Sequence, residues 1–315
     1  MRARRSRRCA PSFPTPPRPS EWSRSSRSRS AASHDGASRV EKRVLGLIAG
    51  SGPLPFEVAQ AAREHGLRVA IAAIEDNTDP AIEREADGPF RWVNAGELGL
   101  LIAFLAGAGA REVILAGAVS KAAILREPGR LRPDARALAL LSSLAAKGDD
   151  AILRAVAGEL ESEGLEVVES TRYLEKRMVR EGPLCGGPPD EALRADLSLG
   201  MRVVRSLGVH DVGQACLVRQ GTVLAVEALE GTDRMIRRGA EFGAGAVLVK
   251  AAKPKQDMRF DVPVIGPGTV EIARECRLRA IGLEAGRTLV LEQTRTLAQA
   301  EAAAISVVGL DPGLG

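Results

Sequence analysis

The sequence predicts a two-domain α/β protein preceded by a disordered basic arm. Three observations lead to this prediction. Short, nearly continuous apolar runs, typical of strands buried in a sheet, alternate with longer stretches of helical periodicity. The 315 residues are enough for two domains, each with its own core. The first 43 residues differ sharply in composition from everything that follows them.

The arm, residues 1–43, is rich in Arg, Ser and Pro and contains only Phe13 and Trp22 as large apolar side chains. Such a segment cannot bury enough surface to offset its ordering entropy, so we expect it to be disordered. A transit peptide, a twin-arginine signal without its apolar region, and an arm touching anionic lipid are alternatives. A further hypothesis is that translation begins near Val40 or Val44, where a strand pattern starts.

The positive charge of the chain is concentrated in this arm, where eleven Arg and one Lys stand against three acidic residues, a net of +9. The whole chain is +4, so residues 44–315 carry the difference, 4 − 9 = −5. A mildly acidic body argues against a nucleic-acid-binding enzyme. No apolar run reaches the roughly 18 residues of a membrane-spanning helix. The four cysteines lack C-x-x-C spacing, so we expect reduced thiols and a cytoplasmic protein.

Residues 44–175 are predicted to form a Rossmann-like domain that binds a nucleotide or phosphate. The apolar run 44–49 leads into a glycine turn and a helix, and 67–74 predicts the next strand. Glycines at a helix N-terminus bare backbone N–H groups, which suit phosphate or pyrophosphate. Pro55 replaces the third glycine of the dinucleotide fingerprint, however, so that motif is incomplete. A plain tight turn is the alternative interpretation.

A second turn of small residues, Gly117 to Ser120, follows the strand predicted over 112–116. It lies at a strand's carboxyl end, the edge where open α/β sheets bind ligands. A helix is predicted over 134–146. Residues 147–150 break the pattern, and Asp149 or Asp150 can cap a second helix that runs to about Glu163.

Residues 176–315 are predicted to form a catalytic α/β domain. Gly and Pro over 181–190 predict a loop, which a helix follows. The runs 214–219 and 222–228 turn at Gln220-Gly221 and predict a hairpin. Helices and strands then alternate to the end of the chain.

A stiff, charged loop follows the strand predicted over 246–250. Cations and carboxylates lie close together here, while Pro254 and Pro263 restrict the backbone. Such a loop can present lysines to phosphate oxygens and a carboxylate to water or metal, although a charge run is more often a solvated loop. The charged residues are Lys250, Lys253, Lys255, Asp257, Arg259 and Asp261.

The sequence does not contain the motifs that several common hydrolytic mechanisms require. The sequence contains no G-x-S-x-G and no P-loop motif, and its three histidines are scattered. Carboxylates, lysines and backbone amides remain, and they suit Mg²⁺-assisted attack of water on phosphorus.

Residues 44–312 resemble the UDP-2,3-diacylglucosamine pyrophosphatases of lipid A biosynthesis, in the branch unrelated to calcineurin-like phosphoesterases. The resemblance rests on LGLIAGSGPLP at 45–55, AGAVS at 116–120 and KGDDAILR at 147–154. The longest and most specific stretches are DVGQACLVRQGTVLAVEALEGTDRMIRR at 211–238 and LVKAAKPKQDMRFDVPVIGPGTV at 248–270.

The resemblance implies hydrolysis of a UDP-linked diacylated glucosamine to UMP and 2,3-diacylglucosamine 1-phosphate, with Mg²⁺ as cofactor. It also implies a homodimer, and a lipid product makes peripheral contact with the inner membrane leaflet plausible. The essential aspartate of the family maps onto Asp261, as the catalytic residue and a metal ligand, and Glu227 is a second metal candidate. Expected substrate contacts are Gly50, Gly52, Pro53, Gly117, Ser120, Gln214, Thr232, Asp233, Lys253, Lys255 and Gln256. Ala118 stands where the family leads us to expect a polar residue, so only backbone donors are expected there.

Two other functions are compatible with the residues. Glu75 follows the second strand roughly where a dinucleotide-binding oxidoreductase places its ribose-binding acid. A non-catalytic binder of nucleotide-sugars would keep the cleft without the chemistry.

Overall fold

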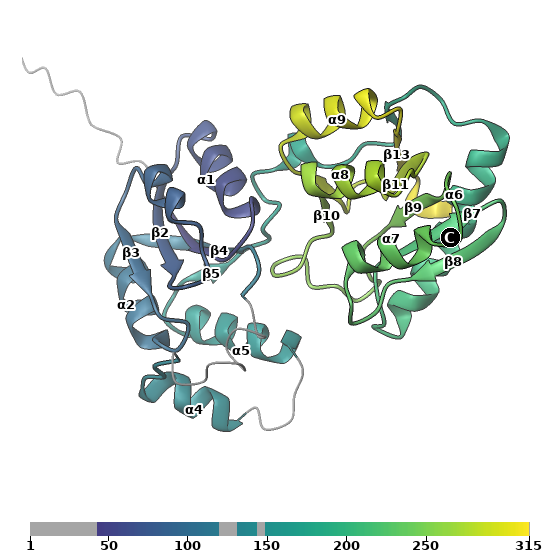
Figure 1. Ribbon diagram of the computed structural model, residues 1–315. Helices are drawn as coiled ribbons and strands as arrows, with labels where there is room; N and C mark the ends of the chain where they lie inside the picture. Colours follow the sequence, from purple (N-terminus) through teal and green to yellow (C-terminus); the bar gives the residue numbers. More distant parts are fainter. Residues whose placement is uncertain (1–42, 120–130, 144–148, 315) are drawn as a thin grey trace, which may run out of the picture. The chain divides into compact units, whose positions relative to one another are not determined.

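The computed structural model describes residues 43–119, 131–143 and 149–314. Of the predicted arm it describes Arg43 alone, and residues 1–42 lie outside these ranges. The first domain contains a five-stranded parallel sheet in the order β3-β2-β1-β4-β5 (Figure 1). The strands are β1 (Val44–Ala49), β2 (Arg68–Ile74), β3 (Phe90–Val93), β4 (Ala110–Ala116) and β5 (Glu166–Val167). This confirms the Rossmann-like parallel sheet that the apolar runs predict.

Helices cover both faces of this sheet because alternate side chains of each strand point to opposite faces. In β1, Leu45 and Leu47 join a core cluster with α1, whereas Ile48 joins a cluster with α2. Figure 1 shows α1 on one side of the strands and α2, α4 and α5 on the other. The helices are α1 (Leu54–Glu64), α2 (Leu98–Gly107), α4 (Ala135–Ser143) and α5 (Asp149–Ser162).

The second domain contains a six-stranded mixed sheet in the order β6-β13-β11-β9-β7-β8. Only β9, β11 and β13 run parallel; β6, β7 and β8 pair antiparallel to their neighbours. The predicted hairpin is present, with Gln220 and Gly221 both at positive φ in its turn. The strands are β6 (Gly182–Cys185), β7 (Ala215–Arg219), β8 (Thr222–Val226), β9 (Val247–Lys250), β11 (Ala280–Glu284) and β13 (Ser306–Leu310).

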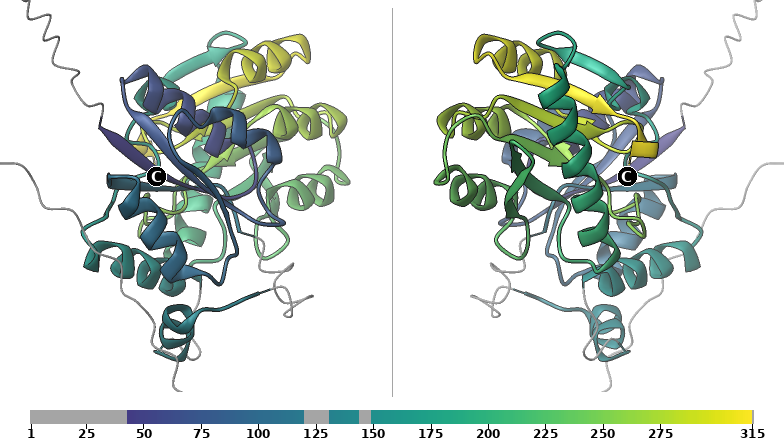
Figure 2. Two further views of the ribbon diagram at one scale, coloured as in Figure 1. Left: turned by 90° about the vertical axis from the view of Figure 1, so that its left-hand side faces the viewer. Right: turned by 90° about the vertical axis from the view of Figure 1, so that its right-hand side faces the viewer.

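One helix covers one face of the second sheet and three cover the other. In the right-hand view of Figure 2, the long α6 lies across the strands. Its residues Leu197 and Met201 pack with Val218 and Val249, whereas Met235 and Val270 belong to the cluster on the opposite face. The helices are α6 (Glu191–Val209), α7 (Thr232–Ala240), α8 (Pro267–Glu275) and α9 (Gln293–Ala302).

The remaining elements are short. A two-stranded parallel pair joins β10 (Val264–Ile265) to β12 (Leu289–Val290). Short 3₁₀ turns are η1 (Pro80–Glu85), η3 (Glu175–Arg177) and η4 (Pro312–Leu314). Among the described residues, no helix is both long and apolar enough to cross a membrane.

The prediction of a loop over 181–190 is wrong in part, because β6 forms there and pairs with β13. Pro183 is tolerated because β6 is an edge strand, where a missing N–H need not cost a ladder hydrogen bond. The first sheet ends at Val167 and the second begins at Gly182. The boundary between residues 175 and 176 stays a prediction.

Candidate active site

Two turns of small residues meet at the carboxyl edge of the first sheet, one after β1 and one after β4. The Gly50 amide donates to the Ala116 carbonyl at 2.8 Å. Ser51 and Ala118 exchange backbone hydrogen bonds of 2.8 and 3.2 Å. These bonds tie the two predicted ligand-binding turns directly to each other.

Glycine is required where the two turns touch. A Cβ on Gly117, which has φ of +85°, would lie 2.4 Å from the Ser51 carbonyl oxygen. A Cβ on Gly50 would lie 2.7 Å from the Ala118 carbonyl oxygen. Gly52 has φ of +89° but no atom within 4 Å of an added Cβ. The first two glycines therefore serve packing, and Gly52 leaves open space at the start of α1.

The supply of backbone donors at the start of α1 is smaller than the sequence predicts. The amides of Gly50 and Ser51 are engaged within the turn pair, and the prolines at 53 and 55 carry no N–H. Among the described residues, no acceptor engages the amides of Gly52 and Leu54. Those two amides are the donors that an anion at this helix start would meet.

A chain of buried polar groups lies at the carboxyl end of β9 in the second domain. The carboxylate of Glu227, which directly follows β8, accepts from the backbone N–H of Gln214 at 3.1 Å and from the Thr232 hydroxyl at 2.6 Å. The Lys250 ammonium donates to the Thr232 hydroxyl oxygen at 3.2 Å and to the Val264 carbonyl at 3.1 Å. Lys250 and Glu227 are each only 7% exposed, so both ionisable groups depend on these partners.

Lys250 is surrounded by negative charge. Burial lowers the pKa of its ammonium below the ordinary value, while the charges of Glu227, Asp261 and Asp233 act in the opposite direction. The negative charges of three carboxylates therefore favour the protonated form of this buried lysine.

The Asp261 carboxylate is exposed and oriented by an amide whose own direction is fixed. The Gln256 side-chain carbonyl accepts from the Lys253 backbone amide at 2.7 Å. A backbone N–H can only donate, so the NH₂ group of Gln256 must face the other way. There it donates to Asp261 Oδ2 at 2.5 Å and to Gln214 Oε1 at 3.3 Å. Lys253 itself pairs with Asp211 at 2.6 Å.

The loop that carries Asp261 is attached to the first domain on either side of this residue. Arg259 pairs with Glu161 of α5 at 3.3 Å, and the Met258 carbonyl accepts from the Ser170 hydroxyl at 3.3 Å. Val262 belongs to the core cluster that contains α1, and Phe260 packs against the cluster on the opposite face of that sheet. Contacts from the first domain therefore help to position the loop.

The chain matches the family model described as LpxI N-terminal domain over residues 44–177 and the LpxI C-terminal domain over residues 180–308. The UDP-2,3-diacylglucosamine pyrophosphatase LpxI of Caulobacter vibrioides is 38% identical over 282 residues, which cover 86% of this chain and 98% of that protein. The chain belongs to the LpxI family.

The structure brings one group of the predicted residues of this LpxI-family chain into a single network. Its members are Gln214, Glu227, Thr232, Lys253, Gln256 and Asp261. Asp233 lies exposed in the first turn of α7, and Lys255 is exposed in the Asp261 loop. Gly50, Gly52, Pro53 and Gly117 lie at the carboxyl edge of the first sheet. Ser120 lies outside the described residues.

Two residues that contact this network were not predicted as substrate or metal contacts, although Lys250 was named among the charged residues of the loop after β9. Lys250 ends the apolar run of β9, and the one available signal was a lysine inside a strand that is buried throughout. Asp211, the partner of Lys253, follows α6 and adopts a positive φ of 56°. No short motif marks it.

The geometry does not favour Glu227 as a metal ligand. Both of its oxygens accept hydrogen bonds, from Thr232 and Gln214, and Lys250 supplies a positive charge nearby. Among the described residues, no group of three or more His, Cys, Asp or Glu side chains could hold a metal ion. A metal held mainly by protein side chains therefore does not fit this part of the chain.

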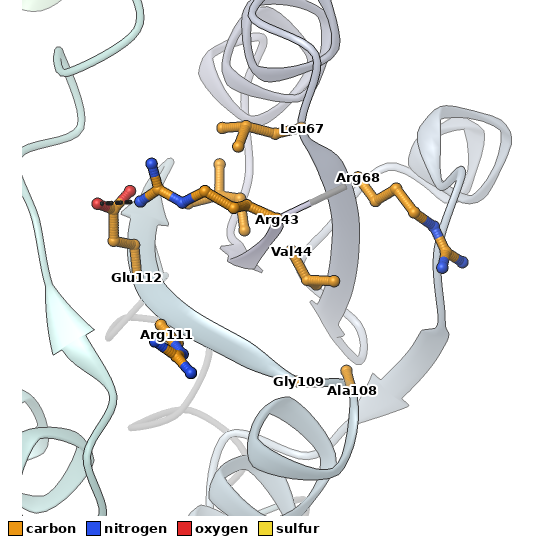
Figure 3. Close-up of a pocket in the computed structure, with 9 residues that line it drawn as sticks. Arg43, Val44, Leu67, Arg68, Ala108, Gly109, Arg111 and Glu112 are labelled. Atoms are coloured by element: carbon orange, nitrogen blue, oxygen red, sulfur yellow. Dashed lines mark hydrogen bonds and ion pairs between the residues drawn. The ribbon is translucent and has the colours of Figure 1, made fainter. Parts of the chain in front are cut away.

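A cavity of about 430 Å³ lies at the opposite, amino edge of the first sheet (Figure 3). Arg43, Arg68, Arg111 and Glu112 are among its lining residues, and Arg43 reaches Glu112 at 3.0 Å. Open α/β sheets bind ligands at the carboxyl edge, so this cavity is on the wrong side for the predicted chemistry. Burial raises the pKa of Glu112, but Tyr173, Arg172 and Arg43 outweigh it, so the pKa lies below its usual value. These contacts fit a structural ion cluster.

The oxidoreductase alternative finds no support at its key residue. Glu75 follows β2, where a ribose-binding acid would lie, but it pairs with Arg132 and accepts a hydrogen bond from Asn94. Family membership points to a different chemistry as well.

Proposed function

We propose that this protein hydrolyses the pyrophosphate of UDP-2,3-diacylglucosamine to UMP and 2,3-diacylglucosamine 1-phosphate in lipid A biosynthesis. The 38% identical relative carries this activity in its name, and both LpxI domains match the chain. The observation that carries the mechanism is the exposed Asp261 carboxylate, which accepts a hydrogen bond from the Gln256 side chain. No side chain with the geometry of an activated nucleophile is needed for this reaction.

In the proposed reaction, a water oxygen bonds to one phosphorus atom and the bridging oxygen leaves with the other. Asp261 would orient this water and accept its proton, a role that typically contributes roughly 10²- to 10⁴-fold to the rate. Lys253 and the amides of Gly52 and Leu54 would bind phosphate oxygens.

We also propose that Mg²⁺ assists, held by Asp261 together with phosphate oxygens of the substrate. Mg²⁺ is commonly bound through one or two carboxylates plus substrate phosphates, so a single protein carboxylate fits. The charge distribution supports the proposal, because the negative charges of Glu227, Asp233 and Asp261 already act on Lys250 before an anionic pyrophosphate arrives. When bound, the ion would offset negative charge on the phosphate oxygens and lower the pKa of a bound water.

The lipid part of the substrate calls for apolar contacts near this site. Leu229, two residues after Glu227, is fully exposed, and Val212, beside Asp211, is 44% exposed. Exposed apolar side chains of this kind suit acyl chains or a membrane surface. We therefore propose a cytoplasmic enzyme that contacts the inner leaflet peripherally. A homodimer is proposed from the family resemblance, and light scattering of the purified protein tests it.

The direct test is to incubate the purified chain with UDP-2,3-diacylglucosamine in detergent, with Mg²⁺ or with EDTA, and to measure UMP. We expect UMP only with Mg²⁺, and no release from the Asp261→Ala variant. Substrate binding without turnover would instead identify a nucleotide-sugar binder. Equal UMP release in EDTA would refute the metal, and equal release by the variant would refute the role of Asp261.

A further inference from the structure

Lys250 is the one described lysine that is buried, and the reaction outlined above assigns it no task. Its ammonium lies at the end of β9 and donates to two segments that are distant in sequence. One bond reaches Thr232 at the start of α7, and the other reaches the backbone of Val264 at the start of β10. Burying an ammonium is costly, so such a residue requires compensating contacts.

We propose that Lys250 is a positioning residue for hydrolysis. It fixes the end of the Asp261 loop and holds the side chains of Thr232 and Glu227 in a fixed position relative to that loop. This inference rests on the proposed function. Val264 is three residues after Asp261, so the bond from Lys250 restrains the loop just beyond the carboxylate. Through the Thr232 hydroxyl, the same ammonium also fixes the orientation of Glu227.

The network continues from Glu227 back to the carboxylate. The Glu227 carboxylate accepts from the backbone N–H of Gln214. The side-chain carbonyl of Gln214 accepts from the Gln256 side chain, which also donates to Asp261. Lys250 thus acts on Asp261 by two routes. One is the loop backbone at Val264, and the other is the series of hydrogen bonds through Thr232, Glu227, Gln214 and Gln256. Displacing a reacting group by about 1 Å can cost roughly 100-fold in rate.

The charge of Lys250 has a second consequence. Glu227, Asp233 and Asp261 all act on this ammonium. Without it, these three negative charges would lose a cation that they share, and their mutual repulsion would be less well compensated. A neutral side chain of similar length would therefore disturb the site even where the fold is retained.

A purely structural role must be separated from positioning. A buried ion pair can often be replaced by a neutral pair without loss of stability, whereas removing one partner is strongly destabilising. Lys250 is linked to Glu227 through the Thr232 hydroxyl, so Lys250→Met alone removes the positive charge that acts with the buried Glu227 and is expected to lower the melting temperature. The double variant Lys250→Met/Glu227→Gln removes both charges and should recover most of that loss.

The experiment measures kcat and KM for UMP release and the melting temperature of four proteins: wild type, both variants above, and Lys176→Met. Lys176 is exposed, so its variant is the matched control and should behave as wild type. We expect kcat of the double variant to stay about 100-fold below wild type, with KM within roughly 3-fold.

Recovery of kcat together with melting temperature in the double variant would overturn the inference, because Lys250 would then be only a structural cation. A large rise in KM at unchanged kcat would also overturn it, since that pattern indicates a substrate contact. If the wild-type chain releases no UMP, the proposed function itself fails, and this outcome is distinct from either of the others.

Discussion

The carboxyl ends of the two sheets differ in the kinds of groups that contact one another there. In the first domain, the turns after β1 and β4 consist of small residues and are joined by backbone hydrogen bonds, to which the Ser51 hydroxyl and the Asn77 side chain each add a bond to the Ala118 carbonyl. In the second domain, the end of β9 is surrounded by carboxylates, amides, a hydroxyl and a buried ammonium that contact one another through side chains. The edge of the first sheet offers closely packed turns and a few backbone amides, whereas the edge of the second offers ionisable side chains.

This difference predicts separate roles for the two edges in stability and in turnover. Backbone turns tolerate little change in side-chain volume, but they carry no group that can take up a proton. The side-chain network can do so, and substitutions there can leave the backbone in place. Changes at the first edge should therefore act mainly on stability, and changes at the second mainly on turnover.

The strongest test of this division is Asp261→Asn. It keeps the shape of the side chain and removes the charge, so we expect kcat to fall at least roughly 1000-fold, about 4 kcal/mol. The melting temperature and KM should change little, because the side chain is exposed and acts in the transition state. Steady-state kinetics and calorimetry measure both. Full activity in this variant would remove Asp261 from the mechanism.

The converse test is made at the first edge with a matched pair of glycines. Gly117→Ala combines a positive φ with a contact of 2.4 Å to the Ser51 carbonyl, so we expect a loss of about 3 kcal/mol in unfolding free energy. Gly52→Ala has a similar φ but open space, and strain alone should cost about 1 kcal/mol. Urea denaturation measures the two values. Equal losses would show that the junction of the turns is not tightly packed.

Gln256→Glu sharpens the comparison within the second domain. The substitution removes the donor to Asp261 Oδ2 and places a second negative charge beside it. We expect kcat to fall roughly 30-fold, about 2 kcal/mol, with a smaller change in KM. Gln60→Glu, at an exposed position of α1, makes the same chemical change away from the site and is the control. A larger change in KM than in kcat would make Gln256 a substrate contact instead.

The smallest effect is expected at the anchor of the Asp261 loop, where Arg259 donates to both oxygens of Asp257 at 3.0 and 2.9 Å. These bonds hold the pKa of Asp257 below its ordinary value of 3.8. A depressed pKa stabilises the fold at pH above that ordinary value, and the contribution disappears as the pH falls through the folded-state pKa.

Asp257→Asn should therefore cost about 0.5 kcal/mol at pH 7 after solvent screening. The difference from wild type should begin to shrink near pH 3.8 and should vanish once the pH is below the folded-state pKa of Asp257. Melting curves across this range measure it. A difference that persists at low pH would mean that packing, not charge, holds the loop.

Periodicity and turn residues in the sequence were enough to predict most of the fold. The apolar run of β1, the glycine turn and the hairpin at Gln220-Gly221 are local features, so local pattern identifies them. The strand β6 was missed because its Gly and Pro residues indicate a loop, and only pairing with β13, more than 100 residues later, makes it a strand.

By itself the sequence predicted two α/β domains and the glycine turns, because strand and turn patterns are set by neighbouring residues. The candidate role of Asp261 came from the resemblance of a long local motif to a known family and stays a prediction. Tertiary structure alone decided which backbone amides are hydrogen-bonded within the turns, which way the Gln256 side chain points, and that Lys250 is buried against Thr232 and Val264. The physical reason is that these properties depend on burial and on partners from other strands. Such partners meet only after the sheet has formed, and the spacing of residues along the chain does not specify them.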